Sequence, residues 1–215
     1  WPADRRLSHG QRYHFIAGWL PWVADGLNLL FNLGAIAWSI GMLLAPHRIE
    51  PPLVMFSLVP VAMFTFRLVK LAHLYVSRVG ANIRETLAAA VAGLSLAHTV
   101  GTAVLKSLFK QQQPFLRTPK LTRRHTIGEI MRATYQELVM LSALLTCACG
   151  LRYSIPLGFG RELSIPHELR APDLSLWIAV LLIQSLPYAA AVLVSAVSVL
   201  PLPAKWLGGG HKNRG

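Results

Sequence analysis

The sequence has few charged residues and very few acidic ones. Of its 215 residues, 14% are charged and 53% are hydrophobic, whereas soluble domains carry about 25% charged residues. Aspartate occurs only at positions 4, 25 and 173, and no Asp-x-Asp pair is present. This composition excludes an ordinary soluble domain and indicates a chain that lies in a lipid bilayer. It also offers no cluster of carboxylates for a divalent metal or for acid–base catalysis, so we assign no metal ligand and no catalytic residue here.

Cysteine is equally scarce. Cys147 and Cys149 stand two apart in an apolar stretch, and side chains with that spacing point to different faces of a helix. We therefore expect two small buried apolar residues rather than a disulfide or a metal-binding pair.

Basic residues, in contrast, outnumber acidic ones by 21 to 9, which gives a formal net charge of +12. A nucleic-acid-binding protein gathers such charge on one face of a soluble fold. Here the cations lie between long apolar runs, where they report membrane topology and contact with anionic lipid or phosphate. The predicted partner is the lipid bilayer and not nucleic acid.

Four apolar runs are long enough to cross a bilayer. Asn28 and Asn32 lie four apart in the first run and therefore share one helix face, which we expect to look into the protein. Arg67 and Lys70 near the end of the second run are expected to snorkel to one interface. The predicted spans are residues 26–45, 53–71, 134–151 and 174–200.

An aromatic segment, residues 11–24, precedes the first span. Tyr13, Trp19 and Trp22 belong to it, and Trp and Tyr favour the headgroup level. The segment is predicted to be an interfacial helix. Its aromatic side chains form either an interfacial belt or part of the lining of a translocation channel, where their flat faces are available for stacking.

Pro21 and Asp25 are expected to separate that helix from the span. Asp25 has two interpretations, which the sequence leaves open. It caps a helix that begins at Gly26, or it is a functional ionisable group at the membrane edge.

Two further polar residues occur in predicted helices. His98 is expected to face the cytoplasm or a neighbouring helix rather than to bind a ligand. Gln184, three residues before Pro187, either faces a channel or marks a tolerated irregularity of the last span.

Residues 84–109 are helical by propensity, and hydropathy alone does not decide whether they span. The segment 106–132 holds seven Lys and Arg residues and one acid, Glu129. If residues 84–109 lie in the interface, all the main basic groups share the cytoplasmic side. If they span, these cations are translocated, and a cation in the membrane costs about 2.5–3.5 kcal/mol. We therefore predict an all-α integral membrane protein with about four transmembrane helices, interfacial amphipathic helices and both termini in the cytoplasm.

This interpretation divides the chain into successive segments. They are an N-terminal interfacial segment (1–25), a first transmembrane hairpin (26–71), an interfacial helix (84–109), a cytoplasmic gating-type loop (110–132), a second transmembrane hairpin (133–200) and a basic disordered tail (201–215).

The loop carries the sharpest motif, Phe115-Leu116-Arg117-Thr118-Pro119-Lys120. It resembles the Phe-x-Val-Thr-x-Lys gating loop of processive, membrane-embedded family 2 glycosyltransferases, the cellulose-synthase-like enzymes. The order of elements is also similar: a Gln-Arg-containing segment (here Gln11-Arg12), two spans, an interface helix, the loop and two final spans.

The resemblance implies the membrane channel and gating part of an enzyme that polymerises a hexose from a UDP-sugar and exports the polysaccharide, in a bacterial inner membrane. The catalytic domain, with its acidic motifs and Mg²⁺, is expected upstream of Trp1. Phe115 would cover the uracil or sugar ring by stacking, and Thr118 and Lys120 would bind diphosphate oxygens. The closed loop would exclude water from the activated sugar.

One residue departs from the family pattern. Arg117 stands where the family usually has Val, so it either adds a phosphate contact or pairs with an upstream carboxylate. It makes a β-1,3-glucan or cyclic glucan a rival to cellulose as product. The alternative to the whole interpretation is a non-enzymatic membrane scaffold or transport subunit, in which the basic loop serves topology alone.

Overall fold

The structure is a computed structural model that describes residues 8–46, 48–109, 127–154 and 167–199. These residues form helices and connecting turns, with no strand among them. The helices are α1 (His9–Leu44), α2 (Val54–Leu74), the π-helical turn η1 (Tyr75–Val79), α3 (Ile83–Ser95), α4 (Ala97–Phe109), α5 (Ile127–Ala133), α6 (Tyr135–Ser154) and α7 (His167–Val199). The predicted all-α fold is confirmed.

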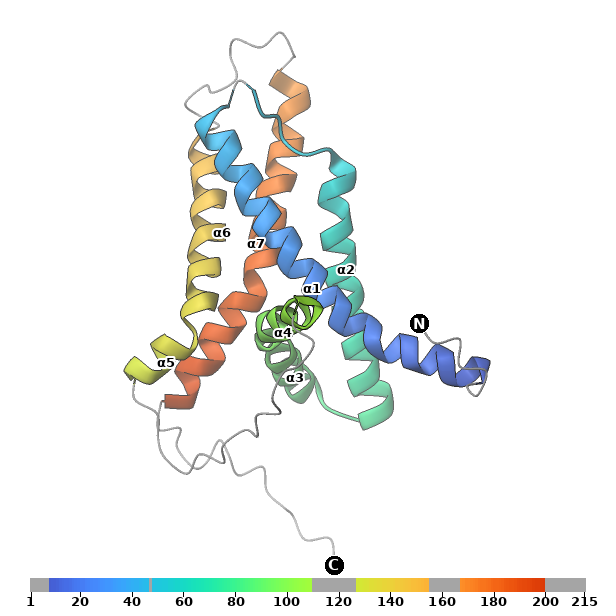
Figure 1. Ribbon diagram of the computed structural model, residues 1–215. Helices are drawn as coiled ribbons and strands as arrows, with labels where there is room; N and C mark the ends of the chain where they lie inside the picture. The colour runs from blue at the N-terminus through green and yellow to red at the C-terminus, as the bar shows by residue number, and fades with distance from the viewer. Residues whose placement is uncertain (1–7, 47, 110–126, 155–166, 200–215) are drawn as a thin grey trace, which may run out of the picture.

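Three long helices, α2, α6 and α7, run lengthwise, and α1 crosses them obliquely (Figure 1). Helix α7 packs against both α6 and α2, and α1 packs against α6. The last helix is therefore the central element of the bundle.

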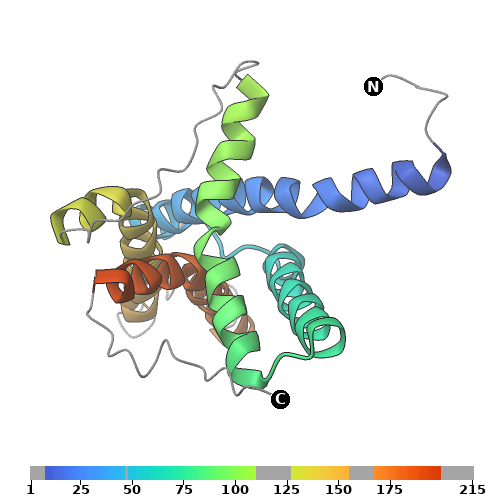
Figure 2. The ribbon, with the colours of Figure 1, turned by 90° about the horizontal axis from the view of Figure 1, so that it is seen from below.

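Helices α3 and α4 lie crosswise to these lengthwise helices. They are seen nearly end-on in Figure 1 and at full length in Figure 2, which looks at the bundle from below. Helix α3 packs against α7, and α4 packs against α1. A single non-helical residue, Leu96, separates them. The pair therefore forms one crosswise element, which covers the segment 84–109 that was predicted to be an interfacial helix.

Local sequence signals explain how this element begins. Gly80 ends the π-helical turn in the left-handed region at φ 68°, which glycine adopts without steric cost. The Asn82 side chain then accepts a hydrogen bond from the Glu85 backbone N–H, and the Glu85 carboxylate accepts one from the Asn82 N–H, both at 2.9 Å. This capping box fixes the start of α3.

Helix α1 is one continuous helix of 36 residues, and this corrects the expected break at Pro21 and Asp25. Pro21 lies inside the helix and is exposed; helices in membranes tolerate such prolines. Because Asp25 is mid-helix, the interpretation as a cap for a helix starting at Gly26 is wrong. The N-terminal part of α1 projects beyond α2 (Figures 1 and 2).

The core lies between α1, α6 and α7. Leu144, Val180 and Leu181 are fully buried there, and α1 contributes Leu29 and Ala35. Cys147 belongs to this core, but Cys149 is exposed, so the expected burial of both cysteines is wrong for Cys149. Side chains two positions apart on a helix point to different faces, so Cys147 and Cys149 do not both face this core.

Large apolar side chains cover the outside of the lengthwise helices. In α2, only Ser57 and Pro60 are buried, and Met55, Phe56 and Phe66 are among its exposed residues. Apolar surface of this extent is unfavourable in water and favourable against lipid. The chain is therefore a helical membrane protein.

By length and composition alone, four helical segments of the described chain could cross a membrane: His9–Leu44, Val54–Val79, Ile83–Phe109 and Asp173–Ser198. This set includes the crosswise α3–α4 element and omits α6, whereas the sequence analysis predicted the opposite assignment. The arrangement of the helices in space favours the assignment predicted from the sequence. Helix α6 runs beside the lengthwise helix α7, whereas α3–α4 lies across α7.

Two predicted loop boundaries are corrected. Helix α5 occupies Ile127–Ala133, within the end of the segment predicted as a gating-type loop. Helix α7 begins at His167, inside the stretch predicted to connect the last two spans. The predicted tail, 201–215, lies outside the described residues.

Candidate functional site

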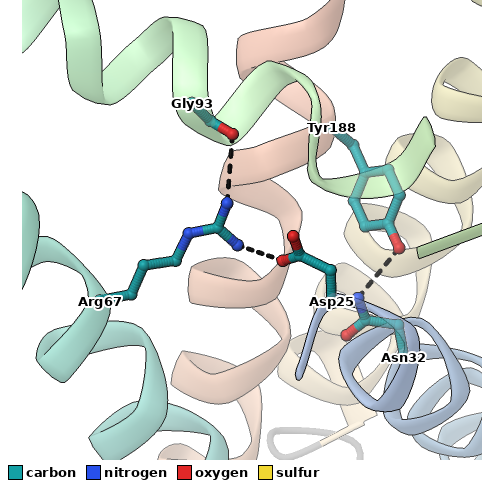
Figure 3. Close-up of polar contacts among 5 residues, drawn as sticks. All are labelled: Asp25, Asn32, Arg67, Gly93 and Tyr188. Atoms are coloured by element: carbon teal, nitrogen blue, oxygen red, sulfur yellow. Dashed lines mark hydrogen bonds and ion pairs between the residues drawn. The ribbon is translucent and has the colours of Figure 1, made fainter. Parts of the chain in front are cut away.

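An ion pair joins the first two long helices where the crosswise element meets them (Figure 3). The Arg67 guanidinium on α2 donates to the Asp25 carboxylate on α1 and, through its other terminal nitrogen, to the Gly93 carbonyl oxygen on α3 at 3.2 Å. The Asp25 side chain is only 10% exposed, and that of Arg67 is 37% exposed. One guanidinium therefore ties α1, α2 and α3 together.

At the same turn of α1, α4 crosses α1 through two glycines. A Cβ atom placed on Gly101 of α4 would lie 2.6 Å from the Asp25 backbone oxygen, a distance that real Cβ atoms do not reach. A Cβ atom on Gly26 of α1 would lie 3.2 Å from a Val104 methyl group. Small residues allow two helix backbones to approach this closely, and we call this contact the α1–α4 crossing.

About two turns further along α1, a second set of polar side chains connects four helices. Asn32, which is fully buried, donates from Nδ2 to the Tyr188 hydroxyl on α7 at 2.9 Å. The Tyr188 ring lies 5.5 Å from the ring of His98 on α4. His98 Nε2 is 3.4 Å from Gln136 Oε1 near the start of α6. We call these four residues the polar cluster.

Several buried polar atoms near the polar cluster have no hydrogen-bond partner among the residues that the structure describes. They include Asn32 Oδ1 and His98 Nδ1, and also Glu137 Oε2 and Gln184 Nε2. Glu137 follows Gln136 directly, and Gln184 lies one turn before Tyr188 on α7. Buried polar groups normally find a partner, often an ordered water molecule, so this part of the bundle interior is suited to hydration or to a polar ligand.

An apolar pocket of about 270 Å³ opens beside the crossing. Trp19, Trp22 and Val23 of α1 line it together with Val104 and Ser107 of α4. Two of the three predicted channel-lining aromatics are therefore brought to one pocket. The third, Tyr13, pairs edge-on with His14 instead. All three aromatic side chains are exposed.

The four predicted gating-loop residues, Phe115, Arg117, Thr118 and Lys120, lie outside the described residues. In the chain they fall between the end of α4 and the start of α5. Among the described residues, no three His, Cys, Asp or Glu side chains are grouped so that they could hold a metal ion. The donor set for the Mg²⁺ that the resemblance implies is not found in this part of the chain.

The sequence did not lead us to predict that Arg67 pairs with Asp25. It also did not lead us to predict that the Tyr188 hydroxyl accepts a hydrogen bond from Asn32. Arg67 does not snorkel as expected but pairs with a carboxylate 42 residues away. One signal was available: a lone Asp and a lone Arg in successive apolar helices are candidates for each other, because ionisable groups within membrane segments usually pair.

Comparison of the chain with models of protein families, with curated proteins and with solved structures finds no match.

Proposed function

We propose that this chain is the membrane channel and gating region of a processive glycosyltransferase that polymerises a hexose from a UDP-sugar and exports the product. The motif in residues 115–120 is the starting point of the proposal. Hexose transfer itself would be carried out by a catalytic domain, with its Mg²⁺, in sequence upstream of this chain.

The observation that carries the proposal is the crosswise α3–α4 element and its place in the chain. It lies across the lengthwise helices (Figure 2), and it is followed directly by the segment that bears the motif. A helix pair in this orientation fits the membrane interface, where it would present that segment at the surface of the bilayer rather than within it. Two lengthwise helices, α6 and α7, then follow, which is the order expected of the family.

The charge distribution supports a cytoplasmic position for this surface. With α3–α4 in the interface, the cations of residues 106–132, those at the end of α2 and those near both termini share one side. A nucleotide-sugar is found in the cytoplasm, so the loop and its substrate would meet there. The resemblance to the cellulose-synthase-like family is the basis for proposing a bacterial inner membrane.

The loop residues have chemistry suited to a bound UDP-sugar. Phe115 offers an aromatic face for the uracil or a sugar ring. Thr118 offers a hydroxyl and Lys120 an ammonium group for diphosphate oxygens, and Arg117 adds a guanidinium that favours bidentate phosphate contacts. Closure over the substrate would exclude water and protect the activated sugar from hydrolysis.

The pocket at Trp19 and Trp22 supports a path for the growing polymer. Aromatic faces and apolar walls bind the C–H faces of sugar rings, and the pocket lies against α4, the helix that leads to the loop.

The test is incorporation of radiolabelled UDP-hexose by membranes that contain the protein with its natural upstream sequence. We expect labelled polymer that a linkage-specific glucanase digests, which also identifies the linkage. Absence of incorporation from each of UDP-glucose, UDP-galactose and UDP-N-acetylglucosamine, with the protein inserted and folded, would contradict the proposal and favour the scaffold alternative.

A further inference from the structure

The start of α6 places an acidic side chain inside the bundle. Glu137 is only 7% exposed, and it shares a helix face with Met140 and Leu144 of the core, three and seven positions further on. Among the residues that the structure describes, no Lys or Arg forms an ion pair with this carboxylate, and its Oε2 atom has no hydrogen-bond partner. A buried carboxylate without a counter-charge is costly, so a positive charge bound beside Glu137 would stabilise the bundle.

The polar cluster brings neutral polar groups of three other helices to this carboxylate. Glu137 is close enough to the Tyr188 hydroxyl of α7 for an electrostatic interaction, and that hydroxyl accepts the hydrogen bond of Asn32 from α1 (Figure 3). The ring of His98 on α4 lies 5.5 Å from the ring of Tyr188, and its Nε2 atom lies 3.4 Å from Gln136 Oε1. Gln136 directly precedes Glu137. The polar cluster and Glu137 therefore form one layer across α1, α4, α6 and α7.

The unpaired atoms of this layer are suited to a cation. Asn32 Oδ1 is a buried acceptor without a partner among the described residues. Gln184 is buried one turn before Tyr188 on the same face of α7, and its Nε2 atom is unpaired there as well. The oxygen and nitrogen of an amide are nearly interchangeable in shape, so a half-turn of the Gln184 amide puts its oxygen in the place of Nε2. With the carboxylate of Glu137, the layer offers oxygen atoms from α1, α6 and α7, and oxygen is the ligand that hard cations prefer.

We propose that Glu137, Asn32 and Gln184 bind one small monovalent metal cation, Na⁺ or K⁺, where α1, α6 and α7 meet. The charge of the layer selects this class of ion, because a single carboxylate balances a single positive charge, whereas a divalent ion would leave a net charge buried. A bound cation would tie the three helices together through their side-chain oxygens. The site goes beyond the proposed function and does not depend on it.

The reactivity of a core cysteine reports occupancy of the site. Cys147 is buried in the core between α1, α6 and α7, so N-ethylmaleimide modifies it when these helices separate. The rate is measured by mass spectrometry on the full-length protein in detergent micelles, at one pH, in NaCl, KCl or choline chloride of equal concentration. We expect the reaction in NaCl, in KCl or in both to be slower than in choline chloride by about fivefold or more, because a ligand that binds the closed bundle stabilises it. Equal rates in all three salts would overturn the proposal.

The second cysteine of the same helix separates cation binding from a general effect of salt. Cys149 is exposed, so its reaction does not require the helices to separate, and it should proceed at one rate in all three salts. A parallel decrease at both cysteines would show that salt acts on the reagent or on the whole protein and would also overturn the proposal. A titration of each salt identifies the ion, because the bound cation has the lower half-saturating concentration.

Removal of one charge tests the role of Glu137. Glu137→Gln keeps the shape of the side chain, and in this variant NaCl and KCl should no longer slow the modification of Cys147. In choline chloride its Cys147 should react no faster than that of the wild type, because no unneutralised carboxylate remains. The matched control is Glu129→Gln, which removes an exposed carboxylate of α5 and should keep the full response. A response that persists in Glu137→Gln, or that is lost in Glu129→Gln, would contradict the site.

A substitution of a neutral ligand keeps the test independent of the folding of Glu137→Gln. Gln184→Met retains the length of the side chain and removes the amide oxygen, so the half-saturating cation concentration should rise by about fivefold. An unchanged half-saturating concentration would exclude Gln184 from the site and contradict the proposal. These measurements need no enzymatic activity, so their outcome is separate from that of the sugar-incorporation test.

Discussion

Asn32 donates a hydrogen bond of 2.9 Å to the Tyr188 hydroxyl, across 156 residues of sequence and inside the bundle. The bond joins α1 to α7, the first and last long helices, at a point where Asn32 is fully buried. It is therefore a determinant of the bundle's closure as well as part of the polar cluster.

Removing one partner of this bond should cost more than removing both. Tyr188→Phe leaves the Asn32 amide without an acceptor, and Asn32 Oδ1 is already unpaired. We expect a loss of about 1–2 kcal/mol in the free energy of unfolding, measured by SDS titration in mixed micelles. In the double variant Asn32→Leu/Tyr188→Phe the buried amide is gone, so much of the loss should be recovered. Additive losses in the double variant would show that the two residues are not coupled.

The two partners of the Asp25–Arg67 ion pair should respond unequally to removal. Arg67→Leu leaves a carboxylate whose side chain is only 10% exposed, whereas Asp25→Leu leaves a guanidinium whose side chain is 37% exposed and long enough to reach the interface. We expect Arg67→Leu to lower the free energy of unfolding by about 3 kcal/mol, the low end for a broken buried ion pair, because this pair is partly exposed. Asp25→Leu should lower it clearly less. The same micelle titration measures both, and the reverse order would show that the guanidinium is the more buried charge.

The glycine at the crossing should not tolerate even one methyl group. Gly101→Ala places a Cβ against the backbone of α1, and overpacking of this kind costs about 1–3 kcal/mol. Gly34→Ala is the matched control in α1, because nothing lies within 4 Å of its added Cβ. It should be neutral or stabilising by up to about 1 kcal/mol through helix propensity. Equal stability of the two variants would contradict the close contact between α1 and α4 at Gly101.

Substitutions in the motif 115–120 should show whether its residues bind the substrate or serve membrane topology alone. In the full-length protein, Lys120→Ala and Thr118→Ala should each lower UDP-sugar incorporation at least tenfold, a loss of about 1.4 kcal/mol or more of transition-state stabilisation, without changing the amount of inserted protein. Arg123→Ala is the control, because Arg123 lies outside the motif 115–120 and is one of the loop cations that report topology or contact anionic lipid. Normal incorporation by both loop variants would remove the gating assignment.

Features set by local sequence were predicted well, and those set by distant contacts were not. The spacing of Asn28 and Asn32 predicted an inward face. Asn32 is fully buried and Asn28 is half-buried. The expectation that His98 faces a neighbouring helix is confirmed by Gln136 and Tyr188. Helical periodicity and propensity act over a few residues, so a single sequence displays them.

The errors arise where tertiary structure overrides a local signal. Pro21 and Asp25 are ordinary helix breakers or caps, yet α1 continues through both. There the Asp25 side chain pairs with Arg67, and Gly101 of α4 packs against the Asp25 backbone oxygen. Neither contact is visible in the residues next to Asp25. The depth of Gln184, which is 1% exposed, was likewise undecided, because it depends on which face of α7 meets α6.

The most direct test of the central claim is the labelling of Thr118→Cys, in the Cys147→Ala/Cys149→Ala background, with a membrane-impermeant maleimide. We predict labelling in inside-out membrane vesicles and not in right-side-out vesicles, and at least a fivefold slower reaction when UDP is bound. Labelling from the opposite side of the membrane, or a rate that UDP does not change, would contradict a loop that faces the cytoplasm and closes over a nucleotide-sugar.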